Sequence, residues 1–120
     1  MGMTLFVKEK VFCAAHHLEG HPICGGTHGH NFEVTVGFSS TSTYRDNPVL
    51  DFKNLSEMVD KVLQIFDHVD LGDRCCEELV ADIFVRLKAE LARQTPENLV
   101  KVKFVDISET PKFGARIENE

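Results

Sequence analysis

Residues 28–38 read HGHNFEVTVGF, and this stretch decides the fold. Apolar side chains occupy every second position from residue 32 to residue 38. Side chains at alternate positions of a strand point to the same side of the sheet. The stretch therefore predicts a β-strand with one buried face, which comprises His28, His30, Phe32, Val34, Val36 and Phe38.

This strand begins with two histidines on its buried face. His28 and His30 lie about 7 Å apart along a strand, so both can reach one metal ion. A third histidine, His16, ends an upstream β-rich run. Three neutral imidazoles with a fourth position left open are typical of a catalytic zinc site. In a chain with 6 histidines the spacing can also arise by chance, so it leaves both interpretations open.

Length and composition indicate one globular domain, residues 1–120, with 42% hydrophobic and 27% charged residues. A net charge of −6 argues against a general nucleic-acid binder. No apolar run reaches the roughly 18 residues of a membrane span. The charged run Lys8-Glu9-Lys10 comes too early for a signal peptide. We therefore expect a cytoplasmic protein with no nucleic-acid or membrane partner.

Two β-rich segments precede two helical segments, and two further β-rich segments follow. The expected strands cover residues 4–15, 28–38, 99–107 and 114–117. Asp51 is the expected N-cap of a helix that continues to about residue 66, and a second helix runs from about residue 77 to Gln94. This order predicts an α+β fold, with a four-stranded antiparallel sheet and two helices on one face. Its open edges favour pairing between subunits and therefore a homo-oligomer.

Cys24 is a candidate catalytic residue. It lies in a glycine-containing loop four residues before His28. A thiol beside a bound cation can have a lowered pKa and act as a base or nucleophile. A fourth metal ligand and an inert small residue are the alternatives. No Cys-x-x-Cys pair occurs, which favours free thiols in a reducing compartment over a disulfide framework or a cysteine zinc finger.

Two further places carry groups suited to proton transfer or to recognition. Asp67-His68 follows the first helix, and such a pair can move protons near neutral pH, although a solvated helix end is the commoner explanation. Glu109 lies between the last two strands, where a carboxylate can accept two hydrogen bonds from an amidine-like edge. A solvated turn carboxylate is the alternative.

Together these segments resemble the family of 6-pyruvoyl-tetrahydropterin and 6-carboxy-tetrahydropterin synthases. The match runs in order along nearly the whole chain and comprises Phe12-Cys13-Ala14-Ala15-His16, Cys24-Gly25-Gly26-Thr27-His28-Gly29-His30-Asn31, Leu50-Asp51-Phe52, Phe66-Asp67-His68 and Glu109-Thr110. The resemblance implies the tunnelling fold (T-fold), in which four antiparallel strands pack against two antiparallel helices. It also implies trimers that stack into hexamers, with active sites between subunits.

The resemblance further implies a role for each matching residue. His16, His28 and His30 correspond to ligands of Zn²⁺, and Cys24, Asp67 and His68 to catalytic residues. Glu109 corresponds to the residue that anchors the pterin ring. The implied substrate is 7,8-dihydroneopterin triphosphate, and the implied enzyme is a zinc-dependent lyase.

The family has two branches that share these residues. One makes 6-pyruvoyl-tetrahydropterin by triphosphate elimination, and the other makes 6-carboxy-5,6,7,8-tetrahydropterin with release of acetaldehyde, in the pathway to 7-deazaguanine (queuosine-type) nucleosides. The compact chain and the Cys-x-x-x-His-Gly-His spacing resemble the carboxy branch more closely. Two departures from the family pattern are Gly72, where asparagine is usual, and Cys76, where a pterin-holding threonine is usual. A non-catalytic pterin- or metal-binding paralogue is the alternative from another class, and a dihydroneopterin aldolase-like activity is disfavoured by Cys24.

Overall fold

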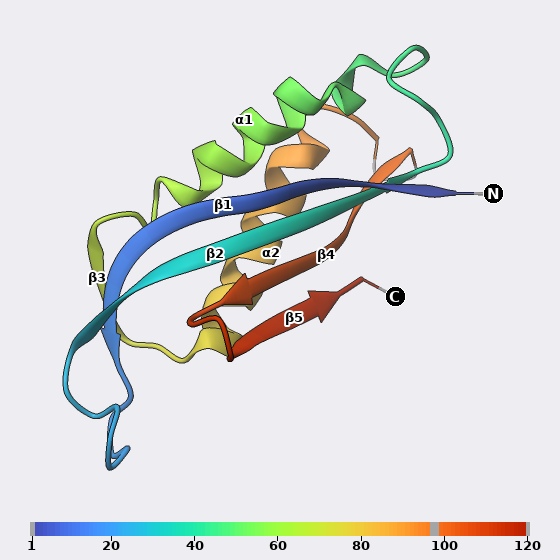
Figure 1. The fold of residues 1–120 in the computed structure, drawn as a ribbon. Coiled ribbons are helices and arrows are strands. Elements are labelled where there is room, and N and C mark those ends of the chain that lie inside the picture. Colours follow the sequence, from blue (N-terminus) through green and yellow to red (C-terminus); the bar gives the residue numbers. More distant parts are fainter. Residues whose placement is uncertain (1, 97–98, 120) are drawn as a thin grey trace.

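The computed structural model describes residues 2–96 and 99–119, and it confirms the α+β class. The strands are β1 (Met3–His17), β2 (His28–Ser40), β3 (Val69–Asp73), β4 (Val100–Ser108) and β5 (Gly114–Glu118). A short 3-10 helix, η1 (Pro48–Leu50), precedes the helices α1 (Phe52–Leu63) and α2 (Cys76–Ala92). The two helices run in opposite directions across one face of a strongly curved sheet (Figure 1).

The sheet has five strands in the order β3-β1-β2-β4-β5, which corrects the prediction of four antiparallel strands. β1, β2, β4 and β5 pair antiparallel, as expected. β3 pairs parallel with β1 at Ala14, Ala15 and His17, so the sheet is mixed. The segment gives no strand signal because its five residues include two aspartates and a glycine, which strands disfavour. β3 pairs with β1 through main-chain groups, and main-chain pairing cannot be read from a pattern of side chains.

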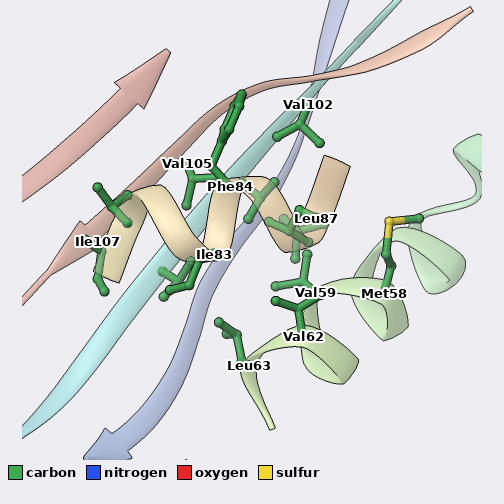
Figure 2. Packing of buried hydrophobic residues seen from close by; sticks show 14 of the residues in the cluster. Met58, Val59, Val62, Leu63, Ile83, Phe84, Leu87, Val102, Val105 and Ile107 are labelled. Carbon is green, nitrogen blue, oxygen red and sulfur yellow. The ribbon is translucent and has the colours of Figure 1, made fainter. Parts of the chain in front are cut away.

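The core lies between the sheet and the two helices. Phe12 of β1 and Phe32 of β2 are paired in register, and their rings stack with centroids 4.9 Å apart. Figure 2 shows buried side chains of α1, α2 and β4 packing together; those labelled are Met58, Val59, Val62, Leu63, Ile83, Phe84, Leu87, Val102, Val105 and Ile107. The apolar positions that predicted the two helices are therefore the ones that pack in the core.

The helices begin close to where the sequence predicts. The Asp51 side chain accepts a hydrogen bond from the main-chain N–H of Lys53 at 2.9 Å, so Asp51 is the N-cap of α1. The helix ends at Leu63, and the buried Phe66 lies in the turn that follows rather than in the helix. No helix in the described residues is long and apolar enough to cross a membrane.

Strand register aligns the predicted histidines. His16 of β1 lies directly opposite His28 of β2, and Ala14 lies opposite His30. Phe12 lies opposite Phe32, two residues beyond the Ala14–His30 pair on the same ladder. Because directly opposed residues share a face of the sheet, the apolar face of the β1–β2 pair ends in a group of three histidines.

Candidate metal centre and active site

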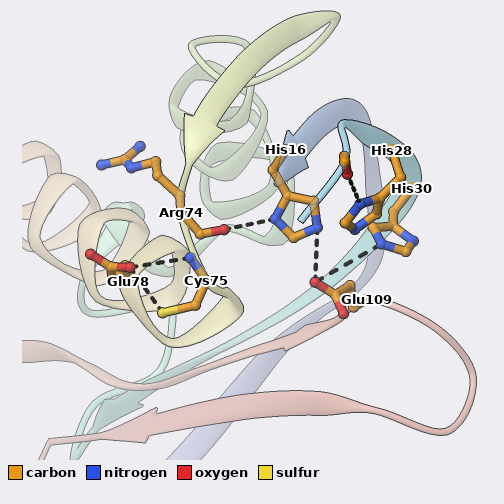
Figure 3. A network of polar contacts seen from close by, with 8 residues as sticks. His16, His28, His30, Arg74, Cys75, Glu78 and Glu109 are labelled. Carbon is orange, nitrogen blue, oxygen red and sulfur yellow. Dashed lines mark hydrogen bonds and ion pairs between the residues drawn. The ribbon is translucent and has the colours of Figure 1, made fainter. Parts of the chain in front are cut away.

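His16, His28 and His30 converge at one end of the sheet. Each offers one ring nitrogen, and these nitrogens all lie within 4.8 Å of one another. Their ring centroids are 4.5 to 5.2 Å apart. The three rings lie together at this end of the sheet (Figure 3). His16 is fully buried, whereas His28 and His30 are half-buried. The structure thus brings together the two histidines that the strand pattern places on one face and His16, the candidate third ligand.

Main-chain carbonyls orient two of the three rings. His16 Nδ1 lies 2.7 Å from the carbonyl oxygen of Arg74, and His28 Nδ1 lies 2.9 Å from that of Gly26. A carbonyl oxygen only accepts, so each Nδ1 is the N–H donor. In the neutral imidazole, this leaves the lone pair on Nε2, which is the arrangement in which proteins present histidine to a metal.

The surroundings of His30 favour its neutral form. Burial lowers the pKa of His30, and the neighbouring His28 and His16 lower it further, while the negative charge of Glu109 acts in the opposite direction. A metal ion binds the neutral imidazole and competes with protons for the ring nitrogen. The lowered pKa therefore favours the form of His30 that can bind a metal ion.

Glu109 contributes a carboxylate to the same group. Its Oε1 lies 3.1 Å from His16 Nε2 and 4.0 Å from His30 Nε2 (Figure 3). The residue follows directly after β4, and its main-chain N–H donates to the carbonyl of Phe113 at 2.9 Å. The turn between β4 and β5 thus fixes the backbone that carries this carboxylate.

The donor set fits a zinc ion. His16 Nε2 and His30 Nε2 are buried and have no hydrogen-bond partner within residues 2–96 and 99–119. Such atoms are rare in folded proteins, and each requires a physical explanation. Three imidazole nitrogens around one point suit Zn²⁺, and the unsatisfied nitrogens would be satisfied by coordination. His16, His28 and His30 are the residues that would hold the ion.

Cys24 lies in the loop that joins the two histidine-bearing strands. Its main-chain carbonyl accepts from Leu18 N–H at 2.7 Å, and its main-chain N–H donates to His21 Nδ1 at 2.8 Å. Its thiol is half-buried and not in a disulfide. These contacts hold the backbone of the loop on both sides of the thiol.

Asp67 and His68 form a pair beside β1, separate from the three histidines. Asp67 Oδ2 lies 3.0 Å from His68 Nδ1, and Asp67 Oδ1 accepts the main-chain N–H of Cys13 at 2.9 Å. The Cys13 N–H, followed by His68, lowers the pKa of Asp67, so this carboxylate is ionised. No hydrogen bond or ion pair in the described part of the chain joins this pair to the histidine group. His68 and His30 nevertheless line one open surface hollow, together with Cys13, Gly29 and Asn31.

Cys76 begins α2 close to Glu109. Burial, with the charge of Glu109 as the next cause, raises the pKa of Cys76 to about 11. Its thiol is therefore protonated at neutral pH. The residue before it closes a capping box, in which Glu78 accepts from the Cys75 N–H at 3.1 Å.

Sequence reasoning does not identify two features of this centre. The first is the pair of carbonyls, from Arg74 and Gly26, because a main-chain acceptor leaves no trace in residue type. The second is the approach of Glu109 to His16, which depends on how β4 pairs with β2. The pairing of β2 with β4 places Ser108 opposite Glu33, and this register determines where Glu109, the next residue, lies.

Comparison with known proteins identifies the fold and the family. A protein of Archaeoglobus fulgidus, provisionally named a 6-carboxy-5,6,7,8-tetrahydropterin synthase, is 35% identical over 106 residues, which cover 88% of each chain. The structure of 6-pyruvoyl tetrahydropterin synthase from Caenorhabditis elegans superposes with a TM-score of 0.80 at 23% identity and covers 100% of this chain and 97% of that one. The same enzyme from Plasmodium vivax gives a TM-score of 0.78 at 20% identity and covers 99% of this chain and 98% of that one.

The two structural likenesses show that the chain has the fold of these synthases. The family model described as 6-pyruvoyl tetrahydropterin synthase matches residues 6–120, and so includes every residue of the candidate site. By this match and by its identity to the archaeal relative, the chain belongs to the 6-pyruvoyl tetrahydropterin synthase family.

Proposed function

We propose that this protein is a zinc-dependent lyase that converts 7,8-dihydroneopterin triphosphate and one water molecule into 6-carboxy-5,6,7,8-tetrahydropterin, acetaldehyde and triphosphate. The observation that carries the proposal is the group of three histidines whose ring nitrogens lie within 4.8 Å of one another. Family membership supports a pterin substrate, and the name of the archaeal relative supports the carboxy product. The proposed enzyme comprises a single domain in residues 1–120 and acts in the cytoplasm.

Each polar residue of the site has a role in this proposal. When bound to His16, His28 and His30, zinc would supply a Lewis acid that lowers the pKa of the substrate's side-chain hydroxyls. The Cys24 thiolate would remove a proton from a side-chain carbon. Asp67 and His68 would move protons to and from the side-chain oxygens. An ionised Asp67 supports this role, because its carboxylate lies 3.0 Å from His68 Nδ1 and can accept a hydrogen bond that orients the imidazole.

Glu109 and Cys76 would recognise the pterin ring. The carboxylate of Glu109 can accept two hydrogen bonds from an amidine-like edge. Cys76 replaces the threonine that is usual in the family. Its high pKa keeps the S–H intact at neutral pH, so Cys76 can still donate, although a thiol donates more weakly than a hydroxyl.

The second departure, Gly72, concerns the backbone of β3. Gly72 has φ +74°, a left-handed conformation that glycine and asparagine both tolerate. Glycine at this position therefore keeps the chain path of a relative with asparagine and removes only the side-chain amide. We infer that this change affects substrate contacts rather than the fold.

The pyruvoyl reaction is the second candidate, because the family model and the structural neighbours are 6-pyruvoyl tetrahydropterin synthases. A non-catalytic pterin- or metal-binding protein is the third. No hydrogen bond or ion pair among the described residues joins Asp67-His68 to the histidine group, and we infer that the active site is shared between subunits, as the family resemblance implies. We therefore propose a homo-oligomer, a trimer or a hexamer, and expect light scattering during size-exclusion chromatography to give a multiple of three chains.

The deciding experiment is incubation of the zinc-loaded protein with 7,8-dihydroneopterin triphosphate, followed by mass analysis. Acetaldehyde together with triphosphate supports the carboxy reaction. Triphosphate without acetaldehyde supports the pyruvoyl reaction. Binding of zinc and pterin without any product would leave only the non-catalytic candidate.

Cys24→Ala provides the residue-level test of the same proposal. We expect this variant to bind zinc normally and to lose turnover, because the base is removed and the histidines remain. Cys13→Ser is the matched control, since the Cys13 thiol donates to Asn31 Oδ1 at 2.9 Å and a hydroxyl can replace that donor, while the main-chain N–H that Asp67 accepts is unchanged. Loss of zinc in Cys24→Ala would make Cys24 a ligand instead.

A further inference from the structure

The position of the Glu109 carboxylate calls for a cation. Its Oε1 faces His16 Nε2 at 3.1 Å and His30 Nε2 at 4.0 Å (Figure 3). His16 Nδ1–H donates a hydrogen bond to the Arg74 carbonyl. Neutral His16 therefore presents the lone pair of Nε2 to Glu109 Oε1. Neither Nε2 has a hydrogen-bond partner in the described residues, so Glu109 does not satisfy them by accepting a proton. In this tautomer the lone pair of His16 Nε2 and the Glu109 oxygen are two acceptors that face each other with no donor between them.

Converging acceptors repel one another unless a positive charge lies among them. Donor atoms that are about 2.0 to 2.2 Å from a tetrahedral ion are about 3.3 to 3.6 Å from one another. The distances of 3.1 and 4.0 Å from Glu109 to the two nitrogens lie on either side of this range. A small shift of the carboxylate would therefore complete a site of three nitrogens and one oxygen.

We propose that Glu109 is the fourth protein ligand of the metal in the substrate-free protein, and that it leaves the metal when a pterin binds. The departure of Glu109 rests on the function proposed above, in which the same carboxylate accepts hydrogen bonds from the pterin ring. One oxygen cannot serve both partners at full strength. Arrival of the ring would thus open the fourth coordination position for the side-chain hydroxyls of the same substrate.

This exchange would couple recognition to activation. A ligand without an amidine-like edge would not draw Glu109 away, and the metal would remain closed to it. The position of Glu109 supports such movement, because it lies at the start of the β4–β5 turn and its side chain is 25% exposed. The histidines, which lie on paired strands, would keep the ion in place throughout.

Glu109→Gln tests the proposal because it removes the charge and keeps the shape. Zinc affinity would be measured by competition with a chelator, and coordination by the visible spectrum of the cobalt(II)-substituted protein. We expect metal affinity to fall at least about tenfold, the lower end of what loss of a supporting group costs. The cobalt spectrum should change in intensity as the carboxylate is replaced by solvent. Glu109→Asp, which retains a carboxylate on a shorter stem, should give intermediate affinity.

Glu33→Gln is the matched control. It removes the same charge from β2, three residues after His30, and Glu33 pairs with Ser108, the residue before Glu109. The metal affinity of this variant should stay within about twofold of the wild type, because the side chain of Glu33 lies on the opposite face of β2 from His28 and His30. Unphosphorylated 7,8-dihydroneopterin should change the cobalt spectrum of the wild type, and should change that of Glu109→Gln only at much higher concentration, because the variant lacks the carboxylate that accepts from the ring.

Two results would overturn the proposal. One is a Glu109→Gln variant that binds zinc and cobalt as tightly as the wild type with the same spectrum; the enzyme could still turn over, and Glu109 would then be a pterin anchor only. The other is a wild-type protein that binds neither metal. If affinity depends on Glu109 while the zinc-loaded wild type forms no product, the ligand assignment stands and the proposed reaction fails.

Discussion

His68 has an unusual backbone. Its φ is 58°, in the left-handed region that most residues avoid and that asparagine tolerates. His68→Asn therefore removes the imidazole without adding strain. We expect turnover of the pterin substrate to fall about 10²- to 10⁴-fold, as for loss of a general acid–base group, with the thermal unfolding midpoint unchanged. His68→Ala should lose turnover equally, and its thermal unfolding midpoint should lie below that of His68→Asn, because asparagine tolerates the left-handed region better than alanine does. Full activity in His68→Asn would remove this residue from the mechanism.

The lowered pKa of Asp67 makes the stability of the protein depend on pH. The N–H of Cys13 and the His68 side chain lower its pKa from the ordinary value of 3.8. A carboxyl group with a lowered pKa in the folded state contributes stability above its unfolded pKa and loses it as the pH falls through the folded value. The wild type should therefore lose stability below about pH 4 more steeply than Asp67→Asn. Urea unfolding at pH 6 and pH 3 measures the difference, and Asp46→Asn, at an exposed site, should follow the wild type.

At the scale of elements, α1 depends on its N-cap. Asp51 accepts the Lys53 N–H at 2.9 Å and satisfies one of the free donors of the first turn. Asp51→Ala should lower the free energy of unfolding by about 1 kcal/mol. Asp51→Ser retains an acceptor and should recover most of this loss. Equal stability of both variants in urea unfolding would show that the cap contributes little.

The elements also show where sequence reasoning succeeds. β2 is predictable because its apolar side chains alternate over many residues, and the helices are predictable because theirs repeat with helical spacing. β3 is not, because Asp70 and Gly72 interrupt any pattern and only the backbone of β1 defines the strand. The site shows the same difference between features that follow from a local side-chain pattern and features that depend on distant strands. His28 and His30 follow from parity, whereas the contact of Glu109 with His16 depends on pairing between distant strands.

At the scale of the whole molecule, the candidate ligands come from distant parts of the chain. His16 lies on β1, His28 and His30 lie on β2, and Glu109 follows β4. An unfolded chain cannot hold these four groups around one point. A metal that binds only the folded state stabilises it by RT ln(1 + [L]/Kd), about 2.7 kcal/mol at a free concentration 100 times Kd. Thermal unfolding with increasing zinc should show a rising midpoint in the wild type and almost no rise in His16→Ala.

The proposed zinc site would have a consequence beyond catalysis. Where free zinc is scarce, a large fraction of newly made chains would fold without the ion and would keep two buried nitrogens unsatisfied. Those chains would open more often and would be degraded sooner, because proteases act on the open form. The cellular abundance of the protein would then follow the zinc supply, with no regulator other than the fold itself.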